Sequence, residues 1–216
     1  INGPYKPLFD FIKKNHKKIK GDIVETGVFK GSTILALGLF LKKIKSNKKI
    51  FGFDSFSGFP SINLKKDDLS LFYYMYKKRI INKNHYNQVK QLISTKKIIY
   101  NNKIKSKEIS TSQDFSNVDI KLLKKKIKFL GLNNIRLIKG PFKKTLIKRS
   151  KPNKIMAAFI DCDLYDSYMD SLNFIWPRLS KKGLIQLDEY YSLKFPGARL
   201  ACDEFFRGKK HKKKKY

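Results

Sequence analysis

Acidic residues directly follow two apolar runs in the second half of the chain. Asp161 comes after the run 156–160, and Asp188 and Glu189 come after the run 184–187. If both runs are parallel strands, their carboxyl ends lie at one edge of a sheet, where ligands bind in open α/β folds. Carboxylate oxygens there suit Mg²⁺, which takes a few carboxylates together with water and substrate oxygens. The pattern favours a metal site; the alternative is that one acid caps a helix and another pairs with lysine.

A glycine-containing turn follows the first apolar run of the chain. Glu25, Gly27 and Gly31 are spaced as ExGxxxG, directly before a helical pattern that begins at Ser32. Glycines at a strand-to-helix turn let the backbone approach a ligand, and free N–H groups at the helix start can bind it. Phe29 stands where the dinucleotide fingerprint has its middle glycine, which argues against an NAD site. The turn alone is weak evidence, because many α/β proteins need such a glycine for packing.

A second ligand-binding candidate, Asp54, ends the second apolar run and is followed by Ser55. Asp54 lies 23 residues after Gly31, close to the offset of about 20 residues for an acid that binds a ribose diol. A carboxylate at this strand end can accept hydrogen bonds from both ribose hydroxyls. The alternative is an aspartate that only caps a turn, and the upstream glycine turn favours the ribose role.

Positioning these residues requires a sheet, and five short apolar runs are typical of its strands: residues 22–25, 50–53, 135–138, 156–160 and 184–187. Near-continuous hydrophobic runs fit strands covered on both faces. Helical patterns separate them, at residues 32–44, 119–130, 165–179 and 199–206. The alternation predicts a doubly wound, mostly parallel α/β sheet in a single domain over residues 1–216.

Residues 61–116 do not show this alternation of strand and helix patterns. They are rich in Lys, Asn and Tyr and contain amphipathic fragments at 69–81 and 86–93. A structureless loop of this length is unusual inside a domain. We therefore predict an insertion with one or two helices that caps the site.

The composition is strongly basic, with 49 Lys and Arg against 17 Asp and Glu, a formal net charge of +32 and a pI near 10.1. Such a charge is typical of proteins that bind nucleic acid or anionic surfaces. The excess is mostly Lys, spread along the whole chain, whereas Arg suits planar phosphate contacts better. We favour compositional drift over a dedicated nucleic-acid site and leave some attraction of anions open.

Cys162 and Cys202 are the only cysteines. They form neither a disulfide framework nor a CxxC metal motif, which is typical of a reduced intracellular protein, so we expect a cytoplasmic location. No stretch approaches the ~20 apolar residues of a membrane span, and no signal-peptide pattern opens the sequence.

Five segments together resemble the macrocin (TylF-type) O-methyltransferases and keep that family's order. They are GDIVETGVFKGST (21–33), FGFDSFSGFP (51–60), NNIRLIKGPFKKTL (133–146), FIDCDLYDSYMDSLNFIWPRLSKKGLIQLDEYY (159–191) and GARLACDEF (197–205). The resemblance covers most of the chain outside the insertion. It implies a Rossmann-like class I methyltransferase fold, S-adenosylmethionine as cofactor, and Mg²⁺- or Mn²⁺-assisted transfer of methyl to a hydroxyl of a sugar or glycosylated small molecule.

Positions carried over from the family assign the site residues. The resemblance implies that the cofactor is bound by Glu25, Thr26, Gly27, Gly31, Ser32, Asp54 and Ser55. It also implies that the metal is bound by Asp161, Asp188 and Glu189, although the family more often has Asp at the last of these positions. Asp163 is the candidate general base beside Asp161; a helix N-cap ahead of Tyr165 is an equally good interpretation of Asp163.

Two alternatives stay open at this stage. The first is a basic methyltransferase-like protein that binds or methylates RNA, although the insertion carries no RNP or KH signature. The second is a shortened edge of the sheet. Class I methyltransferases normally close with an antiparallel strand pair, and little sequence follows Phe206. We expect a small-molecule or saccharide acceptor as partner and leave a homo-oligomer open.

Overall fold

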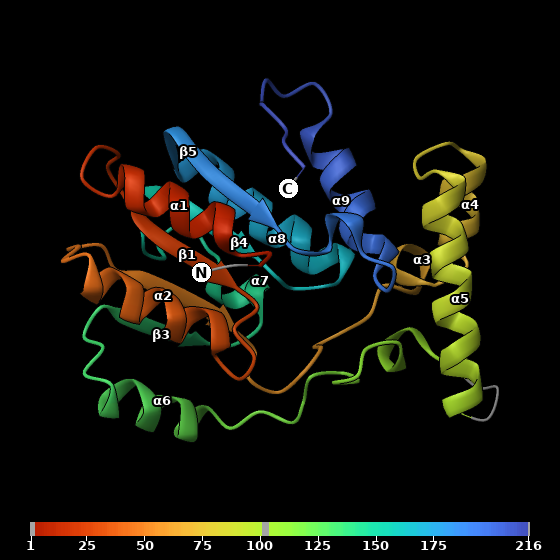
Figure 1. The fold of residues 1–216 in the computed structure, drawn as a ribbon, viewed down its shortest axis with the longest axis horizontal. Helices are drawn as coiled ribbons and strands as arrows, with labels where there is room; N and C mark the ends of the chain where they lie inside the picture. Colours follow the sequence, from red (N-terminus) through yellow and green to blue (C-terminus); the bar gives the residue numbers. More distant parts are fainter. Residues whose placement is uncertain (1–2, 101–103, 216) are drawn as a thin grey trace.

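The computed structural model describes residues 3–100 and 104–215; residues 1–2, 101–103 and 216 of the predicted domain lie outside these ranges. It contains a sheet of five parallel strands in the order β3-β2-β1-β4-β5 (Figure 1). The strands are β1 (Asp22–Thr26), β2 (Ile50–Asp54), β3 (Ile135–Lys139), β4 (Ile155–Ile160) and β5 (Leu179–Leu187). All five predicted strands are present, so the predicted doubly wound sheet is confirmed.

Helices cover both faces of the sheet. One face carries α1 (Lys6–Asn15), α2 (Ser32–Lys43) and α6 (Ile120–Phe129), and the other carries α8 (Tyr165–Ile175) and α9 (Pro196–Phe206) (Figure 1). Side chains alternate along a strand, so Ile23 of β1 packs in the first layer and Val24 in the second. β4 is buried along its whole length, which places it at the centre of both layers.

Local sequence signals account for where the helices begin. The Asp119 carboxylate accepts hydrogen bonds from the N–H groups of Lys121, at 2.7 Å, and Leu122, so it caps α6. The α9 helix starts earlier than predicted, at Pro196, whose fixed φ suits the first helical position. The α1 helix was not predicted, although its buried residues Leu8, Phe9 and Ile12 have helical spacing.

The predicted end of the helix 165–179 and the predicted start of the strand 184–187 are both wrong, for one shared reason. Helix α8 ends at Ile175, because Pro177 falls in a 3₁₀ turn, η2 (Trp176–Arg178), that leads directly into β5. The β5 strand therefore begins at Leu179, several residues before its apolar run. The register of β5 against β4 shifts between Ile155 and Ala157. This irregular first part of β5 contains lysines, so it lacks the apolar pattern by which a buried strand is predicted.

The described residues of the insertion contain three α-helices, where one or two were predicted: α3 (Leu64–Asp67), α4 (Leu71–Lys77) and α5 (Lys83–Ile99), followed by the 3₁₀ turn η1 (Ser106–Glu108). The α4 and α5 helices lie at one end of the molecule, beyond α9 (Figure 1). They share a small core that includes Phe72 and Val89, with Leu200 of α9 packed against it. The two ends of the insertion meet where the Phe59 N–H donates to the Asp114 carbonyl at 3.0 Å.

No helix in the described ranges combines the length and the apolar character that crossing a membrane would take. Cys162 and Cys202 are both buried and both free. Within residues 3–100 and 104–215, no antiparallel pair extends the sheet beyond β5.

Gly27 lies where the strand order reverses, between β1 and β4. Its φ is +87°, and a Cβ built on it would lie 1.6 Å from the Asp161 carbonyl oxygen. Only glycine fits there, because backbone atoms of the neighbouring strand end occupy the space of a side chain. The glycine of the turn thus has a packing role in addition to any role toward a ligand.

We expect Gly27→Ala to lower the free energy of unfolding by about 3 kcal/mol or more, since left-handed strain adds to a backbone collision. Gly208→Ala is the matched control, because Gly208 has φ +73° and open space where a Cβ would lie. It should cost about 1–2 kcal/mol at most. Urea unfolding of both variants measures the difference, and equal losses would contradict the close approach at Gly27.

Candidate active site

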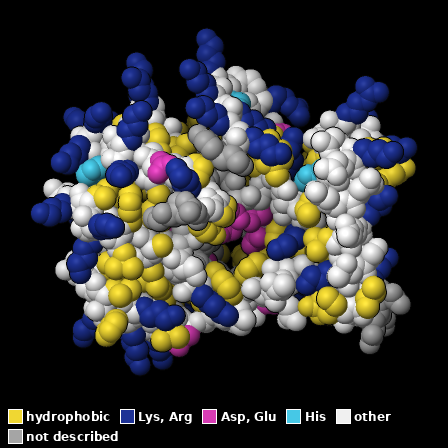
Figure 2. All heavy atoms as spheres, in the orientation of Figure 1, with side chains coloured by type: hydrophobic (Ala, Val, Ile, Leu, Met, Phe, Trp, Pro, Cys, Tyr) yellow, Lys and Arg dark blue, Asp and Glu magenta, His cyan; other side chains and the backbone are white. Residues whose placement is uncertain are grey.

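A cavity of about 290 Å³ lies at the carboxyl ends of the strands, where open α/β sheets bind ligands. Its wall combines the turn after β1, the residues that follow β2 and β3, and the segment from β4 into α8. Figure 2 shows acidic side chains in a hollow near the centre of one face, while lysines project mostly from its periphery. A negative floor inside a basic protein suits a positively charged ligand group or a metal ion.

One backbone hydrogen bond joins each strand end to its neighbour, at 2.9–3.0 Å. The N–H donors are Gly140, Gly27, Asp161 and Asp188, and the carbonyl acceptors, in the same order, are Asp54, Phe53, Thr26 and Ile160. This row crosses the whole sheet. It fixes the first residue beyond each strand and thereby aligns the side chains of the cavity wall.

Glu25 of β1 is buried, with 1% of its surface exposed, and it lines the cavity. Its Oε2 atom has no hydrogen-bond partner among the described residues. Burial raises the pKa of Glu25 well above its ordinary value, and the charges of Asp161 and Asp54 raise this pKa further. A buried acceptor without a donor is costly, so Glu25 is suited to a ligand that brings a donor or a positive charge.

Asp54 lines the cavity as predicted, but its carboxylate is largely occupied by the backbone. Oδ2 accepts the N–H groups of Val28 at 2.7 Å and Phe29 at 2.9 Å, and Oδ1 accepts that of Phe56 at 2.6 Å. A carboxylate has about four acceptor sites. The structure therefore gives Asp54 the turn-binding role that was the alternative in the sequence analysis, and ribose binding stays a prediction.

The other predicted cofactor residues divide into two groups. Gly27, Gly31, Ser32 and Ser55 line the cavity, with Ser32 at the start of α2. The Thr26 side chain is fully buried and is not part of the cavity wall, because alternate residues of a strand point to opposite faces. The structure thus places Thr26 apart from the rest of the predicted set.

Three acidic side chains converge at the ends of β4 and β5. Asp161, Asp163 and Glu189 each offer a carboxylate oxygen, and these atoms lie within 4.8 Å of one another. Asp161 and Glu189 were predicted together, but Asp188 is exposed and Asp163 takes its place. The reason is the 3₁₀ turn η3 (Glu189–Tyr191), in which successive side chains diverge by about 120°.

The ionisation of this cluster is strongly perturbed. Burial raises the pKa of Asp161 to about 7, and the negative charge of Asp188 contributes to the increase. Burial also raises the pKa of Asp163 and of Glu189 well above their ordinary values, with added repulsion from the neighbouring carboxylates. Three acids this close, two buried and one half-buried, cannot all stay charged without a cation.

Glu189 is held by Tyr168 of α8. The Tyr168 hydroxyl lies 2.8 Å from Glu189 Oε2 and 3.0 Å from the Ile160 carbonyl, and it accepts the Glu189 N–H at 3.0 Å. Both Glu189 and Tyr168 are buried. The tyrosine therefore fixes the glutamate side chain at the end of β5.

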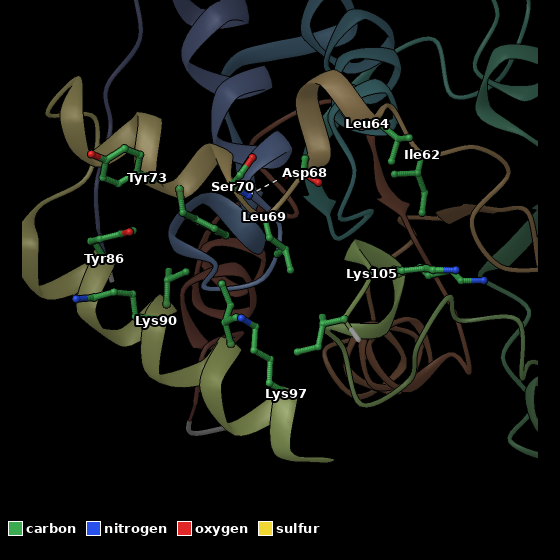
Figure 3. Close-up of a pocket in the computed structure, with 15 residues that line it drawn as sticks. Ile62, Leu64, Asp68, Leu69, Ser70, Tyr73, Tyr86, Lys90, Lys97 and Lys105 are labelled. Carbon is green, nitrogen blue, oxygen red and sulfur yellow. Dashed lines mark hydrogen bonds between the residues drawn. The ribbon is translucent and has the colours of Figure 1, made fainter. Parts of the chain in front are cut away.

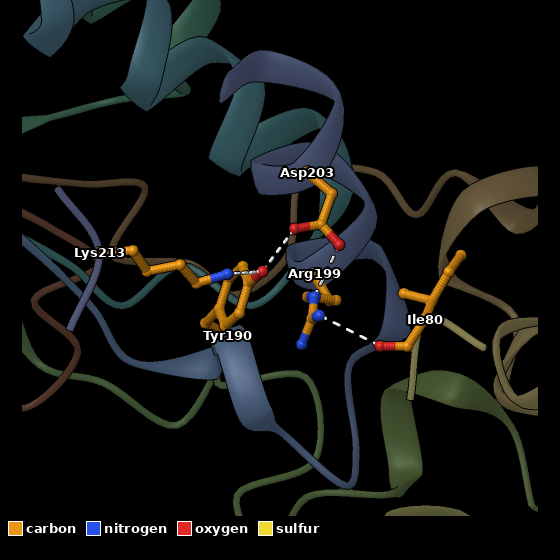
Figure 4. A network of polar contacts seen from close by, with 5 residues as sticks. All are labelled: Ile80, Tyr190, Arg199, Asp203 and Lys213. Atoms are coloured by element: carbon orange, nitrogen blue, oxygen red, sulfur yellow. Dashed lines mark hydrogen bonds and ion pairs between the residues drawn. The ribbon is translucent and has the colours of Figure 1, made fainter. Parts of the chain in front are cut away.

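A polar network fixes the residue after Glu189 (Figure 4). The Tyr190 hydroxyl donates to Asp203, which also accepts from Arg199 Nε at 2.7 Å. The Arg199 guanidinium lies 4.0 Å from the centroid of the Tyr190 ring and donates to the Ile80 carbonyl at 3.1 Å. Lys213 contacts the Tyr190 hydroxyl from the last described segment. The turn that carries Glu189 is thus anchored to α9 and to the insertion.

Asp163 does not cap α8, which excludes the alternative interpretation of this residue. The N-cap position is Leu164, and the N–H of Tyr165 donates instead to Asp67 Oδ1 at 2.8 Å. Asp67 is buried in the insertion, and burial raises its pKa to about 6. Asp163 is therefore free to face the cavity, with φ +61°.

Sequence reasoning missed an aromatic part of the cavity wall. Phe115 lies at the far end of the insertion and contacts Phe29 and Phe59, with ring centroids 5.2 and 5.3 Å apart. All three rings line the cavity, as do Tyr5 and Phe142. Among the described residues, none of α3, α4 or α5 lines it. Residues at the two ends of the insertion line the cavity, and a lid role for its helices stays a prediction.

Asp54→Ala should lower the free energy of unfolding by about 2–4 kcal/mol, because three buried or partly buried N–H groups lose a charged acceptor. Asp10→Ala is the matched control, since Asp10 pairs with Lys6 on the surface and should cost less than about 1 kcal/mol. Urea unfolding measures both. A loss for Asp54→Ala no larger than the control's would show that the two turns do not depend on this carboxylate.

Two O-methyltransferases are similar to this chain in sequence. Mycinamicin III 3''-O-methyltransferase of Micromonospora griseorubida is 28% identical over 189 residues, which cover 87% of this chain and 61% of that protein. Demethyldecarbamoylnovobiocin O-methyltransferase of Streptomyces niveus is 26% identical over 189 residues, which cover 87% of this chain and 58% of that protein. The chain thus spans about three fifths of the length of these curated relatives.

Solved structures share the fold at low identity. The O-methyltransferase NovP gives a TM-score of 0.64 at 19% identity, covering 93% of this chain and 71% of that one. The calicheamicin methyltransferase CalS11 gives 0.62 at 18% identity, covering 92% and 67%. These likenesses confirm the predicted class I methyltransferase fold.

A family model described as macrocin-O-methyltransferase (TylF) matches residues 10–85 and 97–214. The match includes every residue to which the sequence analysis gave a role in the site, and it leaves out residues 1–9, residues 86–96 within α5, and residues 215–216. This chain belongs to the macrocin-O-methyltransferase (TylF) family.

Proposed function

We propose that this chain transfers the methyl group of S-adenosylmethionine to a hydroxyl of a sugar or of a glycosylated small molecule. The observation that carries the proposal is a single cavity whose wall joins the unpartnered, buried Glu25 to Asp161 and Asp163. Family membership supports the reaction class. The names of the relatives, which specify O-methylation of mycinamicin III and demethyldecarbamoylnovobiocin, support an oxygen acceptor in a natural product.

The cavity wall suits S-adenosylmethionine in its charge and in its apolar surface. The cofactor carries a sulfonium and an ammonium group, and Glu25 would accept a hydrogen bond from a positive donor. Phe29, Phe59 and Phe115 offer an apolar surface for an adenine ring. Acceptor capacity left on Asp54 would serve the ribose.

The acidic cluster fits a divalent cation. Asp161, Asp163 and Glu189 would hold Mg²⁺ or Mn²⁺, since their ligand atoms converge and carboxylate oxygens suit these hard ions. None of the three takes part in the ion pairs found within the described residues, which are Lys6–Asp10, Lys66–Glu204 and Arg199–Asp203. The cluster's charge is therefore not neutralised by a paired lysine or arginine.

The reaction requires that the acceptor lose a proton and gain a methyl group. A bound cation would lower the pKa of the acceptor hydroxyl. Asp163, or Asp161 beside it, would take the proton, since both carboxylates line the cavity. When bound, S-adenosylmethionine would supply the methyl group to the acceptor oxygen, and its sulfur would keep the electron pair of the broken carbon–sulfur bond. Binding or methylation of RNA rests on the net charge alone and stays a prediction.

The cofactor assignment is tested at Glu25. Glu25→Gln should weaken S-adenosylmethionine binding about tenfold or more, because a charge-assisted hydrogen bond becomes a neutral one. Thr26→Val is the matched control, since Thr26 neighbours Glu25 but does not line the cavity, and its affinity should stay within about twofold. Isothermal titration measures both variants, and an unchanged affinity in Glu25→Gln would contradict the assignment.

The metal assignment is tested at the acidic cluster. Asp161→Asn and Asp163→Asn should each weaken Mn²⁺ binding and turnover about 100-fold or more, while binding of S-adenosylhomocysteine persists. Asp188→Asn should have a smaller effect, because the Asp188 carboxylate is exposed and acts on Asp161 through its charge without converging on the same point. Mn²⁺ binding is measured by electron paramagnetic resonance and turnover with EDTA present or absent.

Two results would overturn this assignment. Full turnover in excess EDTA would leave a transferase that relies on a general base alone. Loss of Mn²⁺ in Asp188→Asn with normal binding in Asp163→Asn would restore the set predicted from the sequence, Asp161, Asp188 and Glu189.

A further inference from the structure

A second cavity, of about 710 Å³, lies within the insertion and is separate from the candidate active site. It runs between α4, α5 and the segment around η1 (Figure 3). We call it the insertion groove. Its wall is made of Ile62, Leu64, Asp68, Leu69, Ser70, Phe72, Tyr73, Tyr86, Val89, Lys90, Ile93, Lys97, Ile104, Lys105 and Lys107. Nothing in the reaction proposed above uses this space.

The inner part of the insertion groove is apolar. Phe72 and Val89 are buried in its floor, with 1% of each exposed. Ile62, Leu69 and Ile93 are half-buried beside them. A cavity of this volume and character is in the range that holds a small organic molecule.

Lysines give the groove a positive rim. Lys90, Lys97, Lys105 and Lys107 are exposed around it. The acid in its wall is Asp68, which accepts the N–H of Ser70 at 2.8 Å. In Figure 3, Lys97 extends along the groove toward Leu69, whereas Lys90 and Lys105 extend outward at opposite ends. Such long side chains keep their stems on apolar surface and their charge in water, so the rim suits a negatively charged group on an apolar ligand.

The groove adjoins the candidate active site through one short segment. Phe59, Pro60 and Ser61 line the active-site cavity, and Ile62 and Leu64 line the groove. Between them, the Asn63 side chain donates to Asp166 at 3.3 Å, and Asp166 lines the active-site cavity. One molecule that reaches past this segment would therefore touch both spaces.

We propose that the insertion groove binds the apolar, negatively charged part of the methyl acceptor, while the hydroxyl that is methylated lies in the active-site cavity. This proposal rests on the proposed function for the identity of the ligand. Charge complementarity favours a single anionic amphiphile as the occupant. A second copy of this chain would bring a formal charge of +32 against the same lysines, which disfavours it.

Dodecyl phosphate, below its micelle concentration and without cofactor, is the probe. We expect saturable binding at one site by isothermal titration. Inorganic phosphate and uncharged dodecyl maltoside should bind at least about tenfold more weakly, because each lacks one of the two recognised features. Lys90→Glu with Lys97→Glu should weaken dodecyl phosphate binding about tenfold or more.

The matched control is Lys121→Glu with Lys128→Glu on α6. These two lysines are exposed, have the same spacing as Lys90 and Lys97, and lie outside the groove. The control should stay within about twofold of the unaltered chain. Equal weakening in both double variants, equal binding of dodecyl maltoside, or binding only to anionic lipid vesicles would overturn the proposal, since each shows non-specific charge, non-specific apolar contact or a membrane surface instead.

A second measurement links the groove to the acceptor. With an acceptor that is turned over, dodecyl phosphate should raise its KM in proportion to groove occupancy and leave the affinity for S-adenosylmethionine unchanged. Binding without this competition would overturn the acceptor assignment. Failure of the proposed function would show differently, as intact dodecyl phosphate binding in a chain that binds no S-adenosylmethionine.

Discussion

The structure depends on the row of backbone hydrogen bonds that joins the five strand ends, from Gly140 to Asp188. Because each bond fixes the first residue beyond a strand, the side chains that follow cannot shift independently. Asp54 extends the same constraint beyond the sheet by binding N–H groups in the turns after β1 and β2. The glycine turn and the acidic cluster face one cavity because the two central strands, β1 and β4, end at the same level.

The electrostatics of the site follow from burial rather than from the charge of the chain. Lysines lie mostly at the periphery, where water screens them, while Glu25, Asp163 and Glu189 are buried together with little solvent. Their pKa values rise although the protein as a whole is strongly positive. A positive exterior around a negative interior lets anionic molecules approach while the cavity itself retains cationic groups.

Much of the fold could be predicted from the sequence because buried strands are short apolar runs between turns. Where a strand contains lysines, as at the start of β5, that signal disappears. The site was harder to predict, since a carboxylate at a strand end has the same sequence pattern whether it binds ribose or backbone, as at Asp54. The choice between Asp163 and Asp188 depends on the direction of η3, and the cap of α8 comes from Asp67, 98 residues away. Long-range contacts of this kind leave no local pattern.

The strand order also has a consequence for how the chain folds. The β1–β2 and β4–β5 pairs join strands that are close in sequence, but the β2–β3 pair spans the insertion and α6, and the β1–β4 pair spans these together with α2 and α7. Closing so long a loop costs conformational entropy, and this cost comes before the contacts between the strands can stabilise the closed loop. We therefore expect the local β1–β2 and β4–β5 pairs to form early, and the two halves that contain them to join slowly. Until they join, β4 exposes an entirely apolar strand, so the unjoined halves are the state of this protein most prone to aggregation.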